Sequence, residues 1–410
     1  MDLHLSRSVC QPQADIKITG SKSETNRLLL LQALFPNIIV ENSSNSDDSE
    51  VMLIALQSNA AAIDIHHAGT AMRFLTAYFA IQEGREVVLT GSFRMKERPI
   101  KTLVQALQDL GATISYEEKQ GFPPIKINGK NIANHKVSLP ANISSQYISA
   151  LLLVAPKLEN GLELTLEGEI TSMPYIQMTL GLLHEIGVET SFEGNTIKVS
   201  PKSQSPKPQL ITVESDWSSA SYFYSIVALS EPGTKITLSS YKENSLQGDS
   251  IVSTVYKNFG VTTVFQDNKI VLVKEANFHL PSSPFRLNLN NAPDIAQTIA
   301  VTCFGLGLAC HLTGLHTLKI KETDRLLALK TELEKLGGKV TITDDSLVLE
   351  AAKSINPGVI VATYQDHRMA MAFAPLALKV PLGIQNAEVV SKSYPDFWND
   401  LKAIGFRIKD

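Results

Sequence analysis

The chain has 410 residues, 44% of them hydrophobic, and its formal net charge is −4 at pH 7. This length predicts two or three domains, and the slightly acidic balance speaks against a general nucleic-acid-binding protein, which is usually basic. Three cysteines without a CxxC motif favour a reduced, cytoplasmic protein over one with a disulfide framework. The N-terminal residues MDLHLSRSVC lack the pattern of a secretory signal, and the apolar runs are too short or too rich in glycine to predict a membrane span.

The first predicted helix opens with cations. In KITGSKSETNRLLLLQAL (residues 17–34) the apolar run begins at Leu28, and Lys22, Ser23 and Arg27 stand before it. The N-terminus of a helix carries partial positive charge, so cations there are unfavourable unless an anion lies among them. The segment therefore predicts an anion-binding site.

An amphipathic segment, a glycine and a short β-prone run recur in this order along the chain. Each copy has apolar residues at helical spacing, a glycine that suits the left-handed position after a helix, and strand-like alternation. We count six copies, at 47–65 (with Ser-Asn in place of the glycine), 98–116, 175–192, 249–265, 324–342 and 394–408. Such turns also occur between helices and strands of unrelated α/β proteins. The pattern therefore predicts an α/β or α+β fold whether or not the copies are true repeats. The Ser-, Pro- and Lys-rich segment 200–216 is interpreted as an exposed connection between two domains of three copies each.

Cations also stand where five later helices are predicted to begin. They are Arg73, then Arg94, Lys96 and Arg98, then Lys321 and Arg325, then Arg368, and finally Lys392. One such arginine alone is best interpreted as a surface residue. The whole set in an acidic protein predicts a site for anions, because arginine suits bidentate contacts with phosphate or carboxylate and lysine suits single-charge contacts.

Three carboxylates lie among these cations. Glu322 directly follows Lys321, and Asp366 stands two residues before Arg368. Asp294 follows a proline at a predicted helix start, where Asp is also a common capping residue. A carboxylate in an otherwise cationic site is a candidate general acid or base.

The segment ISSQYISALL (143–152) begins another helix with neutral hydrogen-bonding side chains. Capping of the helix accounts for Ser144 or Ser145. It does not account for both serines and Gln146 together. These side chains are therefore candidate ligand contacts.

Common cofactor and hydrolase motifs are missing from the sequence. It has no GxxxxGK[ST] P-loop, no GxGxxG fingerprint, no HExxH and no GxSxG. His66 and His67 are adjacent, so on a strand they would point to opposite faces and would not bind one metal together. We expect neither a metal nor a cofactor.

Ten ordered blocks of the sequence resemble one family, the EPSP synthases (3-phosphoshikimate 1-carboxyvinyltransferases) among the enolpyruvyl transferases. The blocks are GSKSETNRLLLLQAL, AGTAMRFLTA, LTGSFRMKERPI, SSQYISALL, SMPYIQMTL, SSASYF, PDIAQTIA, KETDRLLALKTEL, DHRMAMAF and KSYPDFW. The resemblance implies a two-domain α/β (α+β) fold, an inside-out α/β barrel of six βαβαββ-like units with three per domain. It further implies an N-terminal domain over 19–213, a discontinuous C-terminal domain over 1–18 and 214–410, and an active site in the cleft between them.

The resemblance also implies a reaction in the synthesis of aromatic amino acids. The carboxyvinyl group of phosphoenolpyruvate moves to the 5-hydroxyl of shikimate 3-phosphate through a tetrahedral intermediate, and phosphate is released. Proton transfer and electrostatics suffice for this chemistry, so no cofactor or metal is implied. We expect a cytoplasmic monomer whose partners are these two small molecules, without nucleic acid or membrane.

Residue roles follow from the resemblance, position by position. Asp294 is the candidate proton acceptor from the 5-hydroxyl, Glu322 is the candidate acid for C3, and Lys22 is expected to contact both substrates. The residues expected to hold shikimate 3-phosphate are Lys22, Ser23, Arg27, Ser144, Ser145, Gln146, Ser172, Tyr175, Asp294 and Lys321. Those expected to hold phosphoenolpyruvate are Lys22, Gly69, Arg98, Gln146, Arg325, Arg368 and Lys392.

Some positions depart from the family pattern, and two other functions stay open. His67 replaces a usual Asn before the Ala-Gly-Thr of the phosphoenolpyruvate pocket, and further departures are Phe74, Met173, Trp217 and Thr317. One alternative is the sister enzyme that acts on UDP-N-acetylglucosamine, which usually carries a reactive Cys in a loop; no Cys lies in 85–125 here. The other alternative is a non-catalytic anion-binding relative, against which the presence of Lys22, Asp294, Glu322 and Lys392 argues.

Overall fold

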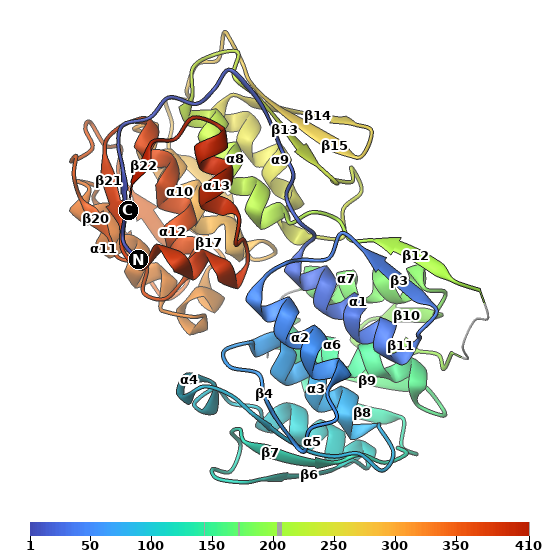
Figure 1. Cartoon of the computed structure of the whole chain (residues 1–410). Helices are drawn as coiled ribbons and strands as arrows, with labels where there is room; N and C mark the ends of the chain where they lie inside the picture. The colour runs from blue at the N-terminus through green and yellow to red at the C-terminus, as the bar shows by residue number, and fades with distance from the viewer. Residues whose placement is uncertain (143, 171–172, 203–206, 410) are drawn as a thin grey trace. The chain divides into compact units, whose positions relative to one another are not determined.

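A computed structural model describes the chain except residues 143, 171–172, 203–206 and 410 (Figure 1). The chain divides into two compact units. One unit is Gly20–Val213, and the other combines Met1–Thr19 with Glu214–Asp410. The boundaries expected from the sequence were after residues 18 and 213.

The unit Gly20–Val213 contains two four-stranded sheets and a two-stranded one. The first sheet has the order β4 (Ala62–Asp64), β5 (Glu86–Thr90), β7 (Ile125–Asn128) and β6 (Thr113–Tyr116). The second has the order β10 (Thr190–Glu193), β11 (Thr196–Val199), β9 (Leu162–Glu167) and β8 (Lys136–Pro140). The two-stranded sheet pairs β12 (Gln209–Thr212) with β3 (Ile38–Glu41) in parallel. Each four-stranded sheet has one parallel pair of strands. The pair is β4 with β5 in the first sheet and β8 with β9 in the second.

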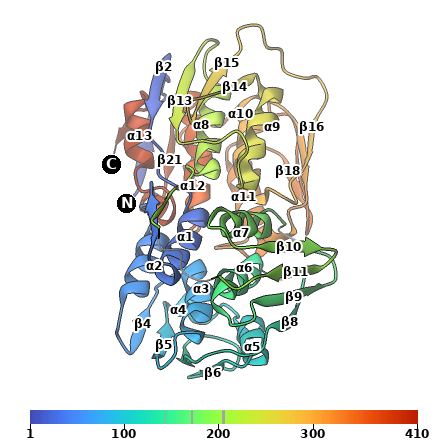
Figure 2. The same cartoon turned by 90° about the vertical axis from the view of Figure 1, so that its right-hand side faces the viewer.

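Helices of this unit pack together in its core. The helices are α1 (Lys22–Leu34), α2 (Asp47–Gln57), α3 (Gly69–Ala80), α4 (Phe93–Lys96), α5 (Lys101–Leu110), α6 (Ser145–Val154), η1 (Ala155–Lys157) and α7 (Met173–Glu185). Helices α1, α3, α6 and α7 pack against one another (Figure 2). Helix α6 is buried from Tyr147 to Val154, as expected of a helix that is apolar on all faces.

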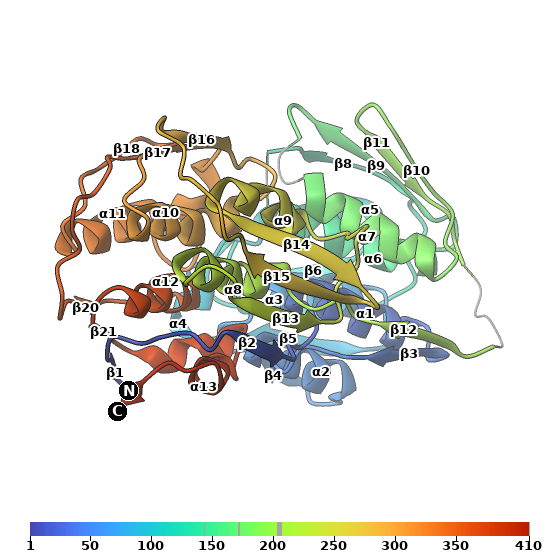
Figure 3. The ribbon, with the colours of Figure 1, turned by 90° about the horizontal axis from the view of Figure 1, so that it is seen from above.

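The second unit contains three four-stranded sheets, and two of them use strands from the N-terminal segment. The orders are β20 (Ile360–Val361), β21 (Leu382–Ile384), β1 (Leu3–Leu5), β22 (Ile408–Lys409); then β14 (Val261–Gln266), β15 (Lys269–Lys274), β13 (Lys235–Ser239), β2 (Gln13–Ile16); then β16 (Phe285–Asn288), β17 (Cys310–Thr313), β19 (Leu347–Leu349), β18 (Val340–Ile342). Strand β1 pairs antiparallel with β21 and β22, and β2 pairs parallel with β13, so the first residues fold with the C-terminal half (Figure 3).

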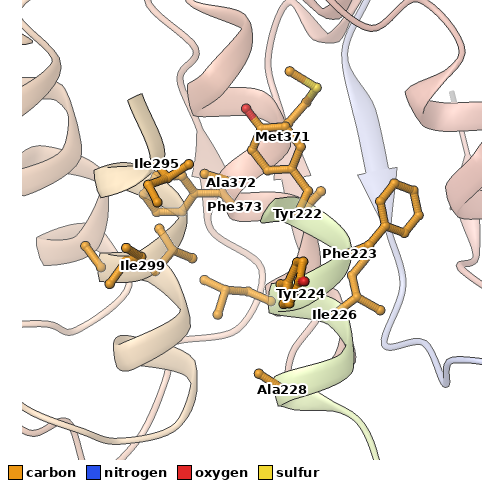
Figure 4. Close-up of a cluster of buried hydrophobic side chains, with 14 of the residues drawn as sticks. Tyr222, Phe223, Tyr224, Ile226, Ala228, Ile295, Ile299, Met371, Ala372 and Phe373 are labelled. Atoms are coloured by element: carbon orange, nitrogen blue, oxygen red, sulfur yellow. The ribbon is translucent and has the colours of Figure 1, made fainter. Parts of the chain in front are cut away.

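Helices α8 and α10 form the centre of this unit. Its helices are α8 (Trp217–Leu229), η2 (Gly248–Ile251), α9 (Val252–Val255), η3 (Tyr256–Phe259), η4 (Pro293–Ile295), α10 (Ala296–Gly305), η5 (His316–Ile320), α11 (Arg325–Lys335), α12 (His367–Phe373), η6 (Ala374–Leu378), η7 (Ala387–Lys392) and α13 (Phe397–Ala403). Every residue of α8 is buried. Figure 4 shows Tyr222 and Tyr224 of α8 beside Ile299 of α10 and Phe373 of α12.

The predicted helix–glycine–strand turns are present. Gly111 follows α5 with φ 114°, and Gly260 follows η3 with φ 75°, a region that a residue with a Cβ rarely adopts. The glycines after α7, α11 and α13 also have positive φ, at Gly187, Gly337 and Gly405. These turns and the mixed sheets confirm the predicted α/β class.

Two segments differ from the sequence expectation. The amphipathic part of the segment 249–265 does not form one helix but the short run η2, α9 and η3, whereas Gly260 and the strand β14 follow it as predicted. The segment 200–216 is not only a connection: β12 lies within it and buries Ile211 beside β3, while its residues 203–206 lie outside the described part. Among the residues that the structure describes, no helix is long and apolar enough to cross a membrane.

Candidate active site

Arg27 joins three helices of the unit Gly20–Val213, α1, α6 and α7. Its Nε donates to Oγ1 of Thr179 on α7 at 2.8 Å, and its Nη2 donates to Oγ of Ser149 on α6 at 2.9 Å. Its Nη1 donates to the carbonyl of Ser23, one turn back on α1, at 2.8 Å. These three acceptors are neutral, so the guanidinium brings positive charge to this part of the three helices.

Arg27 is buried and lies near two aromatic rings. Only 3% of its surface is exposed, and its Cζ lies 5.4 Å from the ring centroid of Phe74 and 5.9 Å from that of Tyr175. Burial lowers the pKa of the guanidinium to about 10. The side chain therefore stays charged at neutral pH. Phe74, a departure from the family pattern, is fully buried and serves as one of the two rings around this cation.

The starts of α3 and α6 are joined by a side-chain hydrogen bond. Nε2 of Gln146 donates to Oγ1 of Thr70 at 3.1 Å. Oγ of Ser144 accepts from the backbone N–H of Gln146 at 3.4 Å, so Ser144 caps α6. The capping explanation considered for the serine pair thus applies to Ser144, and the neighbouring Ser145 is buried in the first turn.

Gly69 and Arg98 are in close contact at the start of α3. A Cβ on Gly69 would lie 2.4 Å from Nη1 of Arg98, so it would displace this guanidinium from its present position. Arg73 fixes the surrounding backbone, because its Nη1 donates to the carbonyl of Gly69 at 3.1 Å and its Nη2 to that of Pro99 at 3.0 Å. Burial and the neighbouring charge of Arg98 lower the pKa of Arg73 to about 10.

Lys22 is the first residue of α1 and lies beside α2. Its Nζ is 3.6 Å from Oδ2 of Asp48, and 23% of its side chain is exposed, which leaves it accessible to a ligand. Nε2 of His67 lies 3.9 Å from Oδ2 of Asp47 on the same helix. The pairing of Lys22 with a carboxylate of α2 was not predicted from the sequence.

In the second unit, Asp294 is surrounded by three cations. Its Oδ1 lies 2.9 Å from Nη1 of Arg325 and 3.5 Å from Nζ of Lys321, and its Oδ2 lies 3.2 Å from Nη2 of Arg368. Nη1 of Arg368 also donates to the backbone carbonyl of Asp294 at 3.1 Å. Asp294 is 7% exposed. The structure thus brings together one predicted catalytic carboxylate and three predicted substrate-binding cations.

Arg325 is held by three carboxylates. Besides Asp294, it contacts Oδ2 of Asp366 through Nε at 2.6 Å and Oε2 of Glu322 through Nη2 at 2.7 Å. Burial alone would lower the pKa of Arg325, but the charges of Asp366, Glu322 and Asp294 raise it above its usual value. Arg325 is therefore a permanent positive charge in a fixed orientation.

Lys392 and Asp249 lie at the edges of this cluster. Nζ of Lys392 donates to the carbonyl of Gln365 at 2.8 Å. Burial and the charge of Asp294 raise the pKa of Asp249 to about 6, although Arg368 and a hydrogen bond from Ser218 oppose the shift. Sequence reasoning missed Asp249, because no cation stands near it in the chain.

Ser172 lies outside the described residues. Trp217, a departure from the family pattern, is fully buried and its Nε1 donates to Oε1 of Glu214 at 2.7 Å, so its indole has a structural partner.

The comparisons with known proteins identify the family. The family model described as EPSP synthase (3-phosphoshikimate 1-carboxyvinyltransferase) matches residues 55–401. The chain belongs to this family. A 3-phosphoshikimate 1-carboxyvinyltransferase of Bacteroides fragilis is 44% identical, over 99% of this chain and 98% of that protein. One from Haemophilus influenzae is 35% identical, over 96% of each.

A solved EPSP synthase of Acinetobacter baumannii matches the fold. The TM-score is 0.79 at 21% sequence identity, and the match covers 100% of both chains. The family, the transferase class and the enolpyruvyl transferase fold predicted from the sequence are therefore confirmed.

Proposed function

We propose that the chain transfers the enolpyruvyl group of phosphoenolpyruvate to the 5-hydroxyl of shikimate 3-phosphate and releases phosphate. Membership of the EPSP synthase family supports this reaction. The observation that carries it is the buried Asp294 among Lys321, Arg325 and Arg368. Such a site combines a proton acceptor with the positive charge that two anionic substrates need.

The cations supply binding energy for both substrates. Opposite charges about 4 Å apart attract by roughly 4 kcal/mol at an effective dielectric constant near 20. Arg325, Arg368 and Lys392 are proposed to hold phosphoenolpyruvate, and Lys321 to hold shikimate 3-phosphate. Arg325 and Arg368 suit the carboxylate and phosphate of phosphoenolpyruvate because the guanidinium is planar and can donate two parallel hydrogen bonds.

Two carboxylates are proposed to move protons. Asp294 accepts the proton of the 5-hydroxyl while the hydroxyl oxygen adds to C2 of phosphoenolpyruvate. Glu322 delivers a proton to C3. In the tetrahedral intermediate a proton then leaves C3 and the bond between C2 and the phosphate oxygen breaks, so the double bond is restored and phosphate is released. Glu322 is held in place by its contact with Arg325 at 2.7 Å and is partly exposed, so its carboxyl group is accessible to a ligand.

The residues of the unit Gly20–Val213 are proposed to act on the same two substrates. Gly69 and Arg98 hold phosphoenolpyruvate, and Lys22 and Gln146 contact both ligands. The residues proposed for shikimate 3-phosphate alone are Ser23, Arg27, Ser144, Ser145, Ser172 and Tyr175. The first turns of α1, α3, α6 and α7 add favourable helix dipoles for a phosphate group.

We further infer that the enzyme acts as a monomer in the cytoplasm. Cys10, Cys303 and Cys310 are buried free thiols in the structure, which suits a reducing compartment.

Phosphate release from phosphoenolpyruvate tests the proposed reaction. The purified chain is assayed with shikimate 3-phosphate and, in parallel, with UDP-N-acetylglucosamine. Release with shikimate 3-phosphate alone is the expected result. Release with the nucleotide sugar alone, or with neither acceptor in a folded protein that binds the ligands, would contradict the proposal.

A further inference from the structure

Glu332 is a fully buried carboxylate outside the set of residues assigned to the substrates. It lies on α11, two turns beyond Arg325, and 0% of its surface is exposed. Nζ of Lys335 lies 2.8 and 2.9 Å from its two oxygens and balances its charge. Its other two partners come from a distant segment: the Tyr364 hydroxyl donates to Oε1 at 2.6 Å, and the Ala362 N–H donates to Oε2 at 3.2 Å.

That segment has an unfavourable backbone. Tyr364 and Gln365 have φ values of 54° and 59°, in the left-handed region that is costly for a residue with a Cβ. Two such residues in succession persist only where the surrounding structure holds them. Glu332 supplies such a constraint, because it bonds to the backbone before the turn and to the side chain of its first residue.

The turn carries groups that orient the candidate active site. Nζ of Lys392 donates to the carbonyl of Gln365 at 2.8 Å. The next residue, Asp366, accepts from Nε of Arg325 at 2.6 Å and caps α12 through the N–H of Arg368 at 2.8 Å. Helix α11 therefore holds the turn at both ends, through its buried glutamate on one side and through Arg325 on the other.

We propose that Glu332 and Tyr364 are positioning residues for the phosphoenolpyruvate-binding cations Arg368 and Lys392. Their hydrogen bond keeps the left-handed turn in place, and the turn places the Gln365 carbonyl and the start of α12. The inference rests on the proposed function, because that function assigns the two cations to phosphoenolpyruvate. Burial and the neighbouring carboxylate raise the pKa of Tyr364 to about 12, so its hydroxyl stays a donor at physiological pH.

Tyr364→Phe tests the inference, since it removes only the hydroxyl. We expect the KM for phosphoenolpyruvate to rise about tenfold, the size of effect of one lost hydrogen bond to a charged group, while the KM for shikimate 3-phosphate stays within about twofold. The matched control is Tyr224→Phe, which removes a hydroxyl that bonds to Oγ1 of Thr263 at 2.7 Å in the same unit. The control should lose similar stability and change neither KM.

A second substitution separates positioning from general damage. Asn adopts the left-handed region more readily than Gln, so Gln365→Asn in the Tyr364→Phe background should recover most of the lost phosphoenolpyruvate affinity. Hydrogen exchange at residues 362–368 should be faster in Tyr364→Phe than in Tyr224→Phe. An unchanged KM for phosphoenolpyruvate, or equal rises in both KM values, in an active enzyme overturns the inference. A wild-type chain that releases no phosphate overturns the proposed function instead. Faster hydrogen exchange in Tyr364→Phe would then show only that the hydrogen bond between Tyr364 and Glu332 holds the turn.

Discussion

Arg325 and Asp366 form a buried ion pair, with 2.6 Å between Nε and Oδ2 and side-chain exposures of 2% and 0%. The two residues stand 41 positions apart in the sequence. Their pairing joins the start of α11 to the start of α12, and each helix start carries a cation proposed to bind substrate. The ion pair is therefore a structural link as well as part of the electrostatics of the site.

Asp366→Asn should destabilise the protein by about 1.5–3 kcal/mol, because the buried Arg325 loses one of its three carboxylate partners while Asp294 and Glu322 remain. The unfolding midpoint in urea measures this loss. Asp344→Asn is the control, since Asp344 lies 2.6 Å from Nζ of Lys319 but is 96% exposed, and an exposed pair contributes little. An equal loss of stability in the two variants would contradict the expectation that the buried ion pair contributes more than the exposed one.

Gly69→Ala should weaken phosphoenolpyruvate binding more than it weakens the fold. The added methyl would lie 2.4 Å from Nη1 of Arg98, and the flexible end of that side chain would have to move. We expect the KM for phosphoenolpyruvate to rise by about tenfold or more, since small misplacements of binding groups are costly. Steady-state kinetics and a thermal melt measure the two effects. A large fall in melting temperature with an unchanged KM would contradict this account of Gly69.

Arg27→Lys should raise the KM for shikimate 3-phosphate by about tenfold, because lysine cannot reproduce the planar donor geometry of arginine. The KM for phosphoenolpyruvate should change little. Arg85→Lys is a suitable control in the same unit, since Arg85 also donates to neutral oxygens, the carbonyls of Ser58 and Ala60. A change in the KM for phosphoenolpyruvate alone would refute the assignment of Arg27.

Asp249→Asn should stabilise the protein at neutral pH. The pKa of Asp249 is about 6 in the folded state, above the ordinary aspartate value of 3.8, so the folded state binds the proton more tightly and its stability falls as pH rises through this interval. Removing the charge should add on the order of 2 kcal/mol at pH 7 and almost nothing below pH 4. Thermal melts between pH 4 and 8 measure this, with Asp15→Asn as an exposed control. A stability difference that does not vary with pH would refute the prediction.

Local features of the fold could be predicted from the sequence. Gly111 and Gly337 follow amphipathic helices, and the left-handed turn that each adopts depends mostly on neighbouring residues. Cations at helix starts could be recognised for the same reason, because neighbouring residues also indicate where a helix begins. The helical part of the segment 249–265 was predicted less well. Its apolar spacing suits one helix, but Val252, Tyr256 and Phe259 reach the core from a run of short helical turns.

Partners distant in the chain could not be predicted from spacing. Arg27 bonds to Ser149 and Thr179, which are 122 and 152 positions away, and no spacing in the sequence predicts that they bond to it. Asp249 was missed because its proximity to Asp294 depends on tertiary structure. The family resemblance supplied the roles of Asp294 and Glu322, whereas the residues alone indicated only an anion site with carboxylates in it.

The most direct test of the central claim is the turnover rate of Asp294→Asn with phosphoenolpyruvate and shikimate 3-phosphate, measured beside the wild type with circular dichroism to verify folding. Asparagine keeps the size of the side chain but cannot accept the hydroxyl proton. The account predicts that kcat falls by about 10²–10⁴-fold in a folded protein that still binds phosphoenolpyruvate. A folded variant whose kcat stays within about threefold of the wild type would contradict the role of Asp294 as proton acceptor.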